Sequence, residues 1–255
     1  MKAIAVIPAR MGSSRFPGKP LAKIRGIPMV GHCYFRTSMC TELLGVYVAT
    51  CDQEIADYVK SIGGKAVMTS AEHKAASDRT AEAMLKIEAE LGEKIDVVVM
   101  VQGDEPMVTP EMISQALAPF RRDATVNVVN LMGRIETIED FEDPNEVKVV
   151  VDKNSDAIYF SREPVPSRKK GSKQVPMLKQ VCIIPFKRDY LLKFNATPES
   201  TLERIESVDM MRIIENAEKV RMVMCESKSC SVDTPEDLQY VEEEMKTDTL
   251  MNRYR

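Results

Sequence analysis

The chain has 255 residues, 44% hydrophobic and 29% charged, which is enough apolar material for one large or two small folded domains. Its formal net charge of -4 argues against a surface that binds nucleic acid or an anionic membrane, so any polyanion must meet a local basic cluster. No apolar run has the length of a signal segment or a membrane span. We therefore expect a cytoplasmic protein with no nucleic-acid or membrane partner.

Cysteine and histidine chemistry is limited by the sequence. The six cysteines form no CxxC pair, and a chain of this length needs no disulfides, so free thiols are expected. The two histidines, His32 and His73, are far apart, and His32 lies in an apolar helical stretch typical of a core position. A zinc centre or a Ser-His-Asp triad therefore has few candidate residues.

Strand-like apolar runs alternate with amphipathic helical runs in the first half of the chain. Strands are expected at residues 3–7, 45–50, 65–68 and 96–101, and helices at residues 28–40, 52–62, 78–91 and 110–121. This alternation, with continuously apolar strands, predicts a parallel sheet covered by helices on both faces. Ligands of such sheets bind at the carboxyl ends of the strands.

The second half of the chain is richer in strands. Strands are expected at residues 125–132, 146–151, 157–160, 178–186 and 219–224, and helices at residues 187–194, 200–217 and from 235 onward. The second and third of these strands are joined by a short polar turn, which is typical of an antiparallel hairpin. We predict one α/β domain over residues 1–255 with a β-rich excursion at about residues 135–190.

A basic loop follows the first predicted strand, in the sequence VIPARMGSSRFPGKPL at residues 6–21. Its spacing matches neither the P-loop nor the GxGxxG fingerprint. Gly12 and its small neighbours let backbone amides approach an anion, while Arg10, Arg15 and Lys19 add full positive charge. The loop therefore suits a triphosphate, although composition alone is equally consistent with a solvated basic turn.

Acidic turns follow two other predicted strands. VVVMVQGDEPMV, at residues 97–108, places Asp104 and Glu105 at the carboxyl edge of the sheet, where the basic loop also emerges. Asp233 precedes the last predicted helix, where either it or Thr234 is a candidate N-cap. A carboxylate at this edge suits Mg²⁺, which prefers one or two carboxylates together with phosphate oxygens and water.

Six segments together resemble one family. They are IPARMGSSRFPGKPL, VATCDQEI, VMTSAEHKAASDRTAEA, VQGDEP, DPNEVKVVVD with AIYFSREPVP, and VDTPEDL. In this order, from residue 2 to about residue 245, they resemble the 3-deoxy-manno-octulosonate (Kdo) cytidylyltransferase family. The resemblance implies a Rossmann-like nucleotide-sugar transferase fold, with a mostly parallel central sheet and helices on both faces. It also implies a homodimer built through the β-rich excursion.

The activity implied by the resemblance is transfer of CMP from CTP to the anomeric hydroxyl of Kdo, with release of pyrophosphate. The partners would be CTP and an acidic ulosonic sugar, the cofactor Mg²⁺, and the product a precursor of lipopolysaccharide or another surface polysaccharide. The reaction needs positioning and charge neutralisation rather than a covalent nucleophile. The scarcity of histidine is then no obstacle.

The resemblance also assigns roles to individual positions. Catalytic roles fall to Arg10, Lys19 and Asp104, and metal binding falls to Asp104 and Asp233. The nucleotide-binding positions are Pro8, Ala9, Arg10, Gly12, Ser13, Arg15, Lys19, Arg79 and Asp104. The sugar-binding positions are Gln102, Arg162, Gln180 and Glu206.

The chain departs from the family pattern at two places. A Ser-Gly pair typical of the family is Ala75-Ala76 here, near the nucleotide positions. In the segment that the family writes HxGIYGY, a histidine is replaced by Gln180 and a glycine by Pro185. These changes leave three alternatives open: a modified ulosonic acid such as 8-amino-Kdo or another acidic sugar, a different nucleotide, and a binding protein without activity.

Overall fold

The structure is a computed structural model that describes residues 1–12, 15–172 and 174–254. The chain divides into two compact units, of which unit 1 comprises Met1–Ser114 and Ser229–Arg255, and unit 2 comprises Gln115–Lys228. The excursion predicted at about residues 135–190 falls within unit 2. That the two units act as a single cytidylyltransferase domain stays a prediction.

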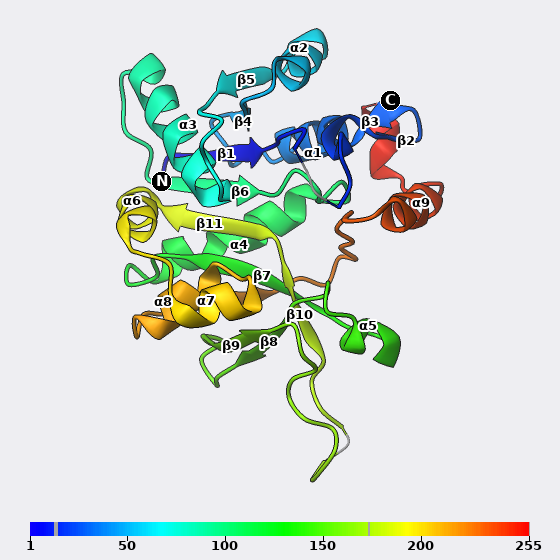
Figure 1. Cartoon of the computed structure of the whole chain (residues 1–255). Coiled ribbons are helices and arrows are strands. Elements are labelled where there is room, and N and C mark those ends of the chain that lie inside the picture. Colours follow the sequence, from blue (N-terminus) through cyan, green and yellow to red (C-terminus); the bar gives the residue numbers. More distant parts are fainter. Residues whose placement is uncertain (13–14, 173, 255) are drawn as a thin grey trace. The chain divides into compact units, whose positions relative to one another are not determined.

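Unit 1 is built on parallel strands, which are labelled in Figure 1. They run in the order β6-β1-β4-β5, each parallel to its neighbour. Their bounds are Ala3–Pro8 for β1, Val46–Thr50 for β4, Lys65–Met68 for β5 and Val97–Val101 for β6. Every residue of β1, β4 and β6 is buried, as expected for a parallel sheet, and the predicted α/β class is confirmed.

The helices of unit 1 lie close to their predicted positions. They are α1 (Met29–Ser38), α2 (Gln53–Ser61), α3 (Ala76–Leu91), α4 (Pro110–Arg122), which continues into unit 2, and α9 (Pro235–Glu244). Short elements of two to four residues escaped prediction because they are too short to show a repeating apolar pattern: η1 (Lys19–Leu21), β2 (Lys23–Ile24), β3 (Ile27–Pro28) and η2 (Leu250–Arg253). His32 is fully buried, and its ring nitrogens bond to Ile24 O and the Tyr254 hydroxyl, which confirms its structural role.

Unit 2 contains a mixed sheet in the order β12-β7-β10-β8-β9. Its strands are β7 (Val129–Arg134), β8 (Lys148–Val151), β9 (Ala157–Ser161), β10 (Leu178–Val181) and β12 (Arg221–Met224). Only the β12–β7 pair is parallel among the paired strands of this sheet that the structure describes. The antiparallel pairing of β8 with β9 confirms the predicted hairpin.

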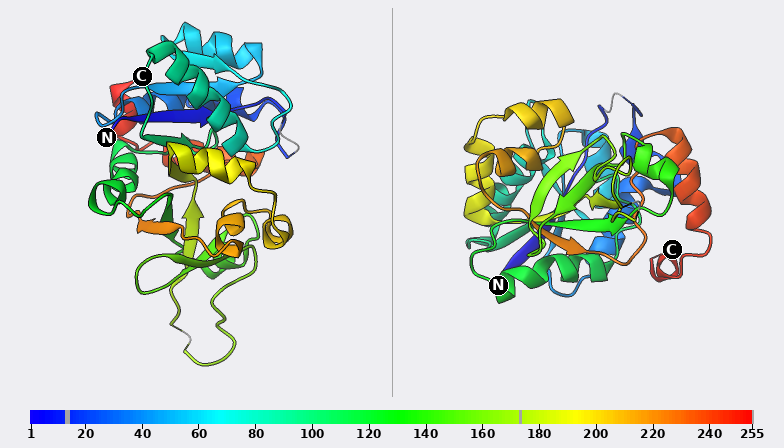
Figure 2. Two further views of the ribbon diagram at one scale, coloured as in Figure 1. Left: turned by 90° about the vertical axis from the view of Figure 1, so that its left-hand side faces the viewer. Right: turned by 90° about the horizontal axis from the view of Figure 1, so that it is seen from below.

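Two predicted elements of unit 2 were wrong in length. The strand expected at 178–186 is two strands, β10 and β11 (Ile183–Lys187), because apolar residues continue through Cys182 and conceal the break. The helix expected at 200–217 is two helices, α7 (Thr201–Glu206) and α8 (Met210–Glu215). Ser207 ends α7 in the left-handed region, with φ of 53°. Unit 2 also contains the helices α5 (Ile138–Glu142) and α6 (Arg188–Ala196). Figure 2 gives two further views of the ribbon.

A buried ion pair joins the two short helices of unit 2. Arg212 Nη2 and Nε lie 2.5 Å and 2.8 Å from the two carboxylate oxygens of Glu203. The side chains of Arg212 and Glu203 are only 8% and 10% exposed. The Arg212 guanidinium also lies 4.4 Å from the ring centroid of Phe194. Removing one member of such a pair leaves the other charge buried without its partner.

We therefore expect Arg212→Met to lower the free energy of unfolding by about 3 to 5 kcal/mol, because Glu203 would remain buried and unpaired. Urea unfolding of purified protein measures the change. Arg204→Met is the matched control, since Arg204 is an exposed arginine on α7, next to Glu203 in the sequence. Equal stability of the two variants would contradict a structural role for the Arg212–Glu203 pair.

Candidate active site

The basic loop begins where β1 ends and is held by three hydrogen bonds that its backbone N–H groups donate. Ala9 N donates to Ala49 O at 2.9 Å, and Met11 N donates to the Asp52 carboxylate at 2.8 Å. Gly18 N donates to Met11 O at 3.1 Å and closes the loop. Gly18 has φ of 75°, a left-handed conformation that favours glycine, and it starts η1 with Lys19 as its first residue. The loop therefore delivers Lys19 from a fixed backbone position.

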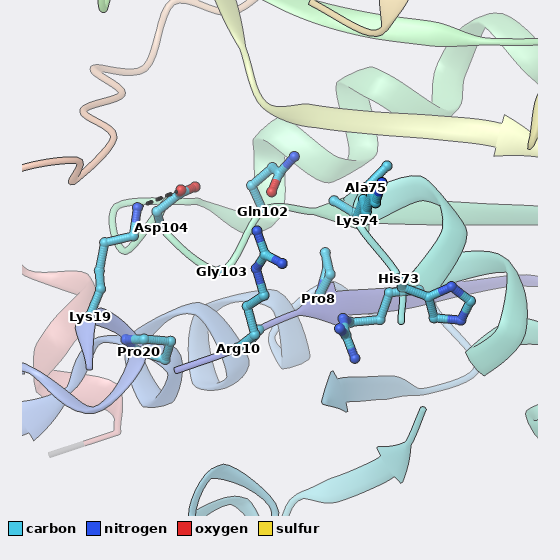
Figure 3. Close-up of a pocket in the computed structure, with 13 residues that line it drawn as sticks. Pro8, Arg10, Lys19, Pro20, His73, Lys74, Ala75, Gln102, Gly103 and Asp104 are labelled. Carbon is cyan, nitrogen blue, oxygen red and sulfur yellow. Dashed lines mark hydrogen bonds and ion pairs between the residues drawn. The ribbon is translucent and has the colours of Figure 1, made fainter. Parts of the chain in front are cut away.

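Lys19 joins two acidic segments that are far apart in the sequence. Its Nζ donates to Asp104 Oδ2 at 2.9 Å, to Asp233 Oδ1 at 3.2 Å and to Val232 O at 2.8 Å. Figure 3 shows the contact with Asp104. Burial alone would lower the pKa of Lys19, but the charges and hydrogen bonds of Asp104 and Asp233 outweigh it and raise the pKa above its ordinary value. Lys19 is therefore charged at neutral pH.

A cavity of about 250 Å³ lies beside this cluster, entirely within unit 1 (Figure 3). Its lining comes from residues 8–10, 19–20, 73–76 and 102–104, together with Arg79. Four of the lining side chains are cations, namely Arg10, Lys19, Lys74 and Arg79. Asp104 is the one carboxylate among the described residues that line the cavity. The excess of positive charge suits a polyanionic ligand.

Arg79 lines the cavity and carries a buried donor without a partner among the described residues. It lies near the start of α3, is 3% exposed, and its Nη1 donates to the Thr69 hydroxyl. Its Nη2 is buried and has no hydrogen-bond partner among the residues that the structure describes. A buried donor without a partner is costly, so a ligand acceptor at this position would be stabilising.

The acidic residues differ in their placement. Asp104 lines the cavity, but Glu105 is 3% exposed and accepts a hydrogen bond from Ser229 Oγ at 2.8 Å, so its predicted place at the sheet edge does not put it in the cavity. Thr234 caps α9 by accepting from Asp237 N, which corrects the alternative in which Asp233 is the cap. The Asp233 carboxylate instead pairs with Lys19 and, at 3.1 Å, with Arg15.

Three of the predicted sugar-binding residues belong to unit 2, whereas Gln102 lines the cavity of unit 1. Glu206 accepts from the Tyr159 hydroxyl at 2.9 Å and from Arg162 N at 2.9 Å. The Arg162 guanidinium donates to three backbone carbonyls, those of Glu206, Ser207 and Pro144. Hydrogen bonds therefore join Arg162 to Glu206, and Gln180 lies on the separate strand β10.

The structure places the remaining predicted residues as follows. Pro8, Ala9 and Arg10 line the cavity, while Gly12 and Arg15 lie further along the basic loop. Ser13 lies outside the described residues. Asp52 has a role that the sequence did not reveal, since it is the N-cap residue of α2 but makes no capping bond and holds the basic loop instead. An aspartate at a predicted helix start is usually assigned to capping, which conceals this role.

Gly103 is required where the turn after β6 passes β1. A Cβ at Gly103 would lie 2.7 Å from Pro8 O, a backbone atom that cannot move without the strand. We expect Gly103→Ala to destabilise the protein by about 1 to 3 kcal/mol and to lower activity, because both segments line the cavity.

Thermal unfolding and turnover of Gly103→Ala measure both effects. Gly12→Ala is the control for stability, since a Cβ there meets no atom within 4 Å among the described residues. If Gly103→Ala unfolds at the same temperature as Gly12→Ala, the close approach is not a constraint on the fold.

The chain is a cytidylyltransferase by family, since the family described as Cytidylyltransferase matches residues 4–220. A protein of Geobacter metallireducens named 3-deoxy-manno-octulosonate cytidylyltransferase is 42% identical, over 96% of this chain and 98% of its own length. A protein of that name from Thermodesulfovibrio yellowstonii is 42% identical over 97% and 99% of the two chains. The chain belongs to the 3-deoxy-manno-octulosonate cytidylyltransferase family.

Solved structures agree with this assignment. CMP:2-keto-3-deoxy-manno-octonic acid synthetase complexed with CTP superposes with a TM-score of 0.88 at 38% identity, over 96% of this chain and 99% of that one. A cytidylyltransferase from Leptospira borgpetersenii, at 18% identity and a TM-score of 0.63 over 97% and 88% of the two chains, shares the fold. Within the described residues, every helix is too short or too polar to cross a membrane.

Proposed function

We propose that this chain joins CMP from CTP to the anomeric hydroxyl of Kdo and releases pyrophosphate. The observation that carries the proposal is the convergence of Lys19, Asp104 and Asp233 beside a cavity with four cationic side chains. The named activity of relatives that are 42% identical over nearly the whole chain supports the same reaction. The CTP complex of a structure that is 38% identical supports the choice of nucleotide.

The reaction consists of attack by the sugar hydroxyl on the α-phosphorus, with departure of pyrophosphate. We assign Arg10 and Lys19 to the triphosphate, where their charge would stabilise the leaving pyrophosphate. Arg10 is exposed in the cavity wall and forms no ion pair with any described residue, so its charge is available to a ligand. We expect the basic loop to supply the backbone amide of Gly12 as well.

We assign Arg79 to the cytosine base. Guanidinium nitrogens are donors only, so the buried Nη2 requires an acceptor, and cytosine offers its ring nitrogen N3 and carbonyl O2. A donor placed at the ring nitrogen N3 of cytosine would meet a protonated ring nitrogen in uracil, whereas carbonyl O2 is an acceptor in both bases, so the contact with N3 is the one that distinguishes them. This polarity supports preference for CTP over UTP.

The chemistry of the acidic pair fits Mg²⁺. Asp104 and Asp233 place carboxylate oxygens within 3.2 Å of the same nitrogen, and their side chains remain 26% and 18% exposed. Carboxylate oxygens with access for phosphate and water are the ligands that Mg²⁺ prefers. When bound, the ion would supply Lewis-acid polarisation of the phosphate and help to ionise the hydroxyl. Lys19 would then exchange its carboxylate partners for phosphate oxygens.

The acceptor sugar is the less constrained part of the proposal. We assign Gln102, Arg162, Gln180 and Glu206 to the sugar side. Gln180 and Pro185 replace a histidine and a glycine of the family pattern, and this observation favours a modified ulosonic acid, such as 8-amino-Kdo, as the second candidate acceptor. Both acceptors would lead to lipopolysaccharide or another surface polysaccharide.

We also propose that the enzyme is a homodimer in the cytoplasm. β9 is the last strand of the unit 2 sheet, and Ile158 on it is 53% exposed, which supports an interface at this edge. All six cysteines are free thiols, as expected in a reducing compartment. Light scattering of purified protein would contradict the dimer if it gave the monomer mass of 28.7 kDa.

Pyrophosphate release tests the proposed reaction. Purified protein would be supplied with Mg²⁺, Kdo or 8-amino-Kdo, and CTP, UTP, GTP or ATP in turn. We expect release with CTP and a smaller rate with UTP. Release with another nucleotide but not with CTP would overturn the choice of base, and no release with any combination would overturn the proposed activity.

A further inference from the structure

The segment of residues 102–108, which carries Asp104, consists of two successive turns. Glu105 N donates to Gln102 O at 3.2 Å, and Val108 N donates to Glu105 O at 3.1 Å. The start of the segment is fixed against β1 by the close approach described above. Because each turn is closed by a hydrogen bond, the position of Asp104 also depends on what holds the segment at Val108.

A buried arginine on α1 holds this second end. Arg36 is 2% exposed, and it donates from Nε to Val108 O at 2.7 Å and from Nη2 to Met107 O at 3.3 Å. Three residues earlier, Cys33 donates from Sγ to Gly103 O at 3.5 Å. Residues three apart lie on the same face of a helix, so one face of α1 contacts the segment at its start and at its end. The planar guanidinium presents its donors in a fixed fork, so it sets the direction as well as the distance of the two carbonyls.

The C-terminal segment, residues 248–254, in turn holds Arg36. The Nη1 of Arg36 donates to the Asp248 carboxylate, whose side chain is 12% exposed, and to the Tyr254 hydroxyl at 3.4 Å. The Tyr254 ring stacks on Phe35 of α1, with ring centroids 5.3 Å apart and an angle of 22° between the planes. The C-terminal segment therefore supports the same guanidinium that holds the turns around Asp104.

His32 sets the direction of the hydrogen bonds in this network. Its Nε2 lies 2.8 Å from Ile24 O, which only accepts, so Nε2 carries the hydrogen. Burial lowers the pKa of His32 below its ordinary value, so the ring is neutral at pH 7 and Nδ1 is an acceptor. The Tyr254 hydroxyl lies 2.9 Å from Nδ1 and donates to it. The hydroxyl oxygen can then accept from Arg36, and all of these hydrogen bonds are mutually compatible.

We propose that Arg36, held by Asp248 and Tyr254, is a positioning residue that keeps the Asp104 carboxylate in place to bind Mg²⁺ together with CTP. The inference rests on the proposed function, which assigns Asp104 to the metal. Lys19 holds this carboxylate in the structure. When Lys19 turns to the triphosphate, the backbone must keep the carboxylate in place without it. Residues that orient a metal ligand from outside the site typically contribute about 10- to 100-fold to metal affinity.

CTP binding in the absence of sugar tests the proposal apart from turnover. Isothermal titration calorimetry would give the Kd of CTP in EDTA and in saturating Mg²⁺, and the ratio of the two measures the coupling between metal and nucleotide. We expect Arg36→Lys to lower this ratio about tenfold, while the Kd in EDTA changes little because Arg10 and Arg79 are unchanged. Lysine keeps the charge opposite Asp248, but its single nitrogen cannot hold both carbonyls and the carboxylate in the same geometry.

Arg212→Lys is the matched control, because Arg212 is also a buried, ion-paired arginine but belongs to unit 2. It should lower the Tm and leave the coupling ratio unchanged. Asp248→Asn and Tyr254→Phe should each lower the ratio by a smaller factor than Arg36→Lys, since each weakens one support of the guanidinium and leaves its contacts with the two carbonyls.

A wild-type coupling ratio for folded Arg36→Lys would overturn the proposal. An equal loss of the ratio in Arg212→Lys would overturn it as well, because lower stability alone would then explain the effect. If Arg36→Lys fails to fold, the double variant Arg36→Met with Asp248→Leu decides by the same ratio, since it leaves no buried charge unpaired. A wild-type Kd for CTP that does not depend on Mg²⁺ would instead overturn the metal site of the proposed function, on which the inference rests.

Discussion

Replacing Lys19 with methionine is expected to lower kcat by about 10² to 10³, the usual cost of one electrostatic contact to a developing charge. Lys19 is the cation that joins Asp104 and Asp233 and lines the cavity, so the change removes charge where pyrophosphate would leave. Since this stabilisation grows as the bond to the leaving group breaks, KM for CTP should change much less than kcat. Steady-state kinetics with CTP and Kdo measure both.

The same variant tests the metal site without reference to turnover. Without the ammonium, Asp104 and Asp233 are two carboxylates facing one position, and their repulsion should lower the Tm. Mg²⁺ should then raise the Tm of Lys19→Met more than that of the wild type, because no lysine competes for the carboxylates. Lys23→Met is the matched control, since Lys23 is exposed in the adjacent β2. A wild-type kcat for Lys19→Met would contradict the role of Lys19 in the reaction.

Asp104→Asn and Asp233→Asn form the second large prediction. Each is expected to lower Mg²⁺-dependent turnover by about 10² to 10³ and to raise the Mg²⁺ concentration that gives half-maximal rate. The amide keeps the shape and the hydrogen bond to Lys19 but loses the charge that a hard cation needs. Titration of Mg²⁺ at saturating CTP and Kdo separates weaker metal binding from slower chemistry.

Asp57→Asn is the control for these two variants, because it makes the same substitution at an exposed position of α2. If Asp233→Asn retained the wild-type Mg²⁺ dependence while Asp104→Asn lost it, the metal would be held by Asp104 without Asp233. Wild-type Mg²⁺ dependence in both variants would contradict the assigned metal site.

Much of unit 1 was predictable because its elements and its loops follow from short stretches of the sequence. The basic loop and the QGDEP turn each directly follow a continuously apolar strand, and the carboxyl ends of parallel strands meet at one edge. That rule alone brings Lys19 near Asp104 without knowledge of any distance. The short helices α7 and α8 were predicted as one helix because neither glycine nor proline marks the break between them. Ser207 ends α7 instead, with φ of 53°.

Contacts between distant residues were not predictable. Asp52 holds Met11 across 41 residues, and Gln180 donates to Asn130 across 50 residues. Neither contact can be inferred from composition or periodicity, because each depends on which segments become neighbours in the fold. Glu105 shows the opposite error, since its position in the turn suggested the cavity while its side chain is buried against Ser229.

³¹P NMR of the reaction of the purified protein with CTP, Kdo and Mg²⁺ tests the proposed transfer most directly. We expect a new phosphodiester signal from a CMP-sugar together with an equal amount of pyrophosphate. Free CMP with pyrophosphate and no phosphodiester at any time would show hydrolysis of CTP instead of transfer. An unchanged CTP spectrum, with Kdo and with 8-amino-Kdo, would contradict the activity of this chain as a cytidylyltransferase.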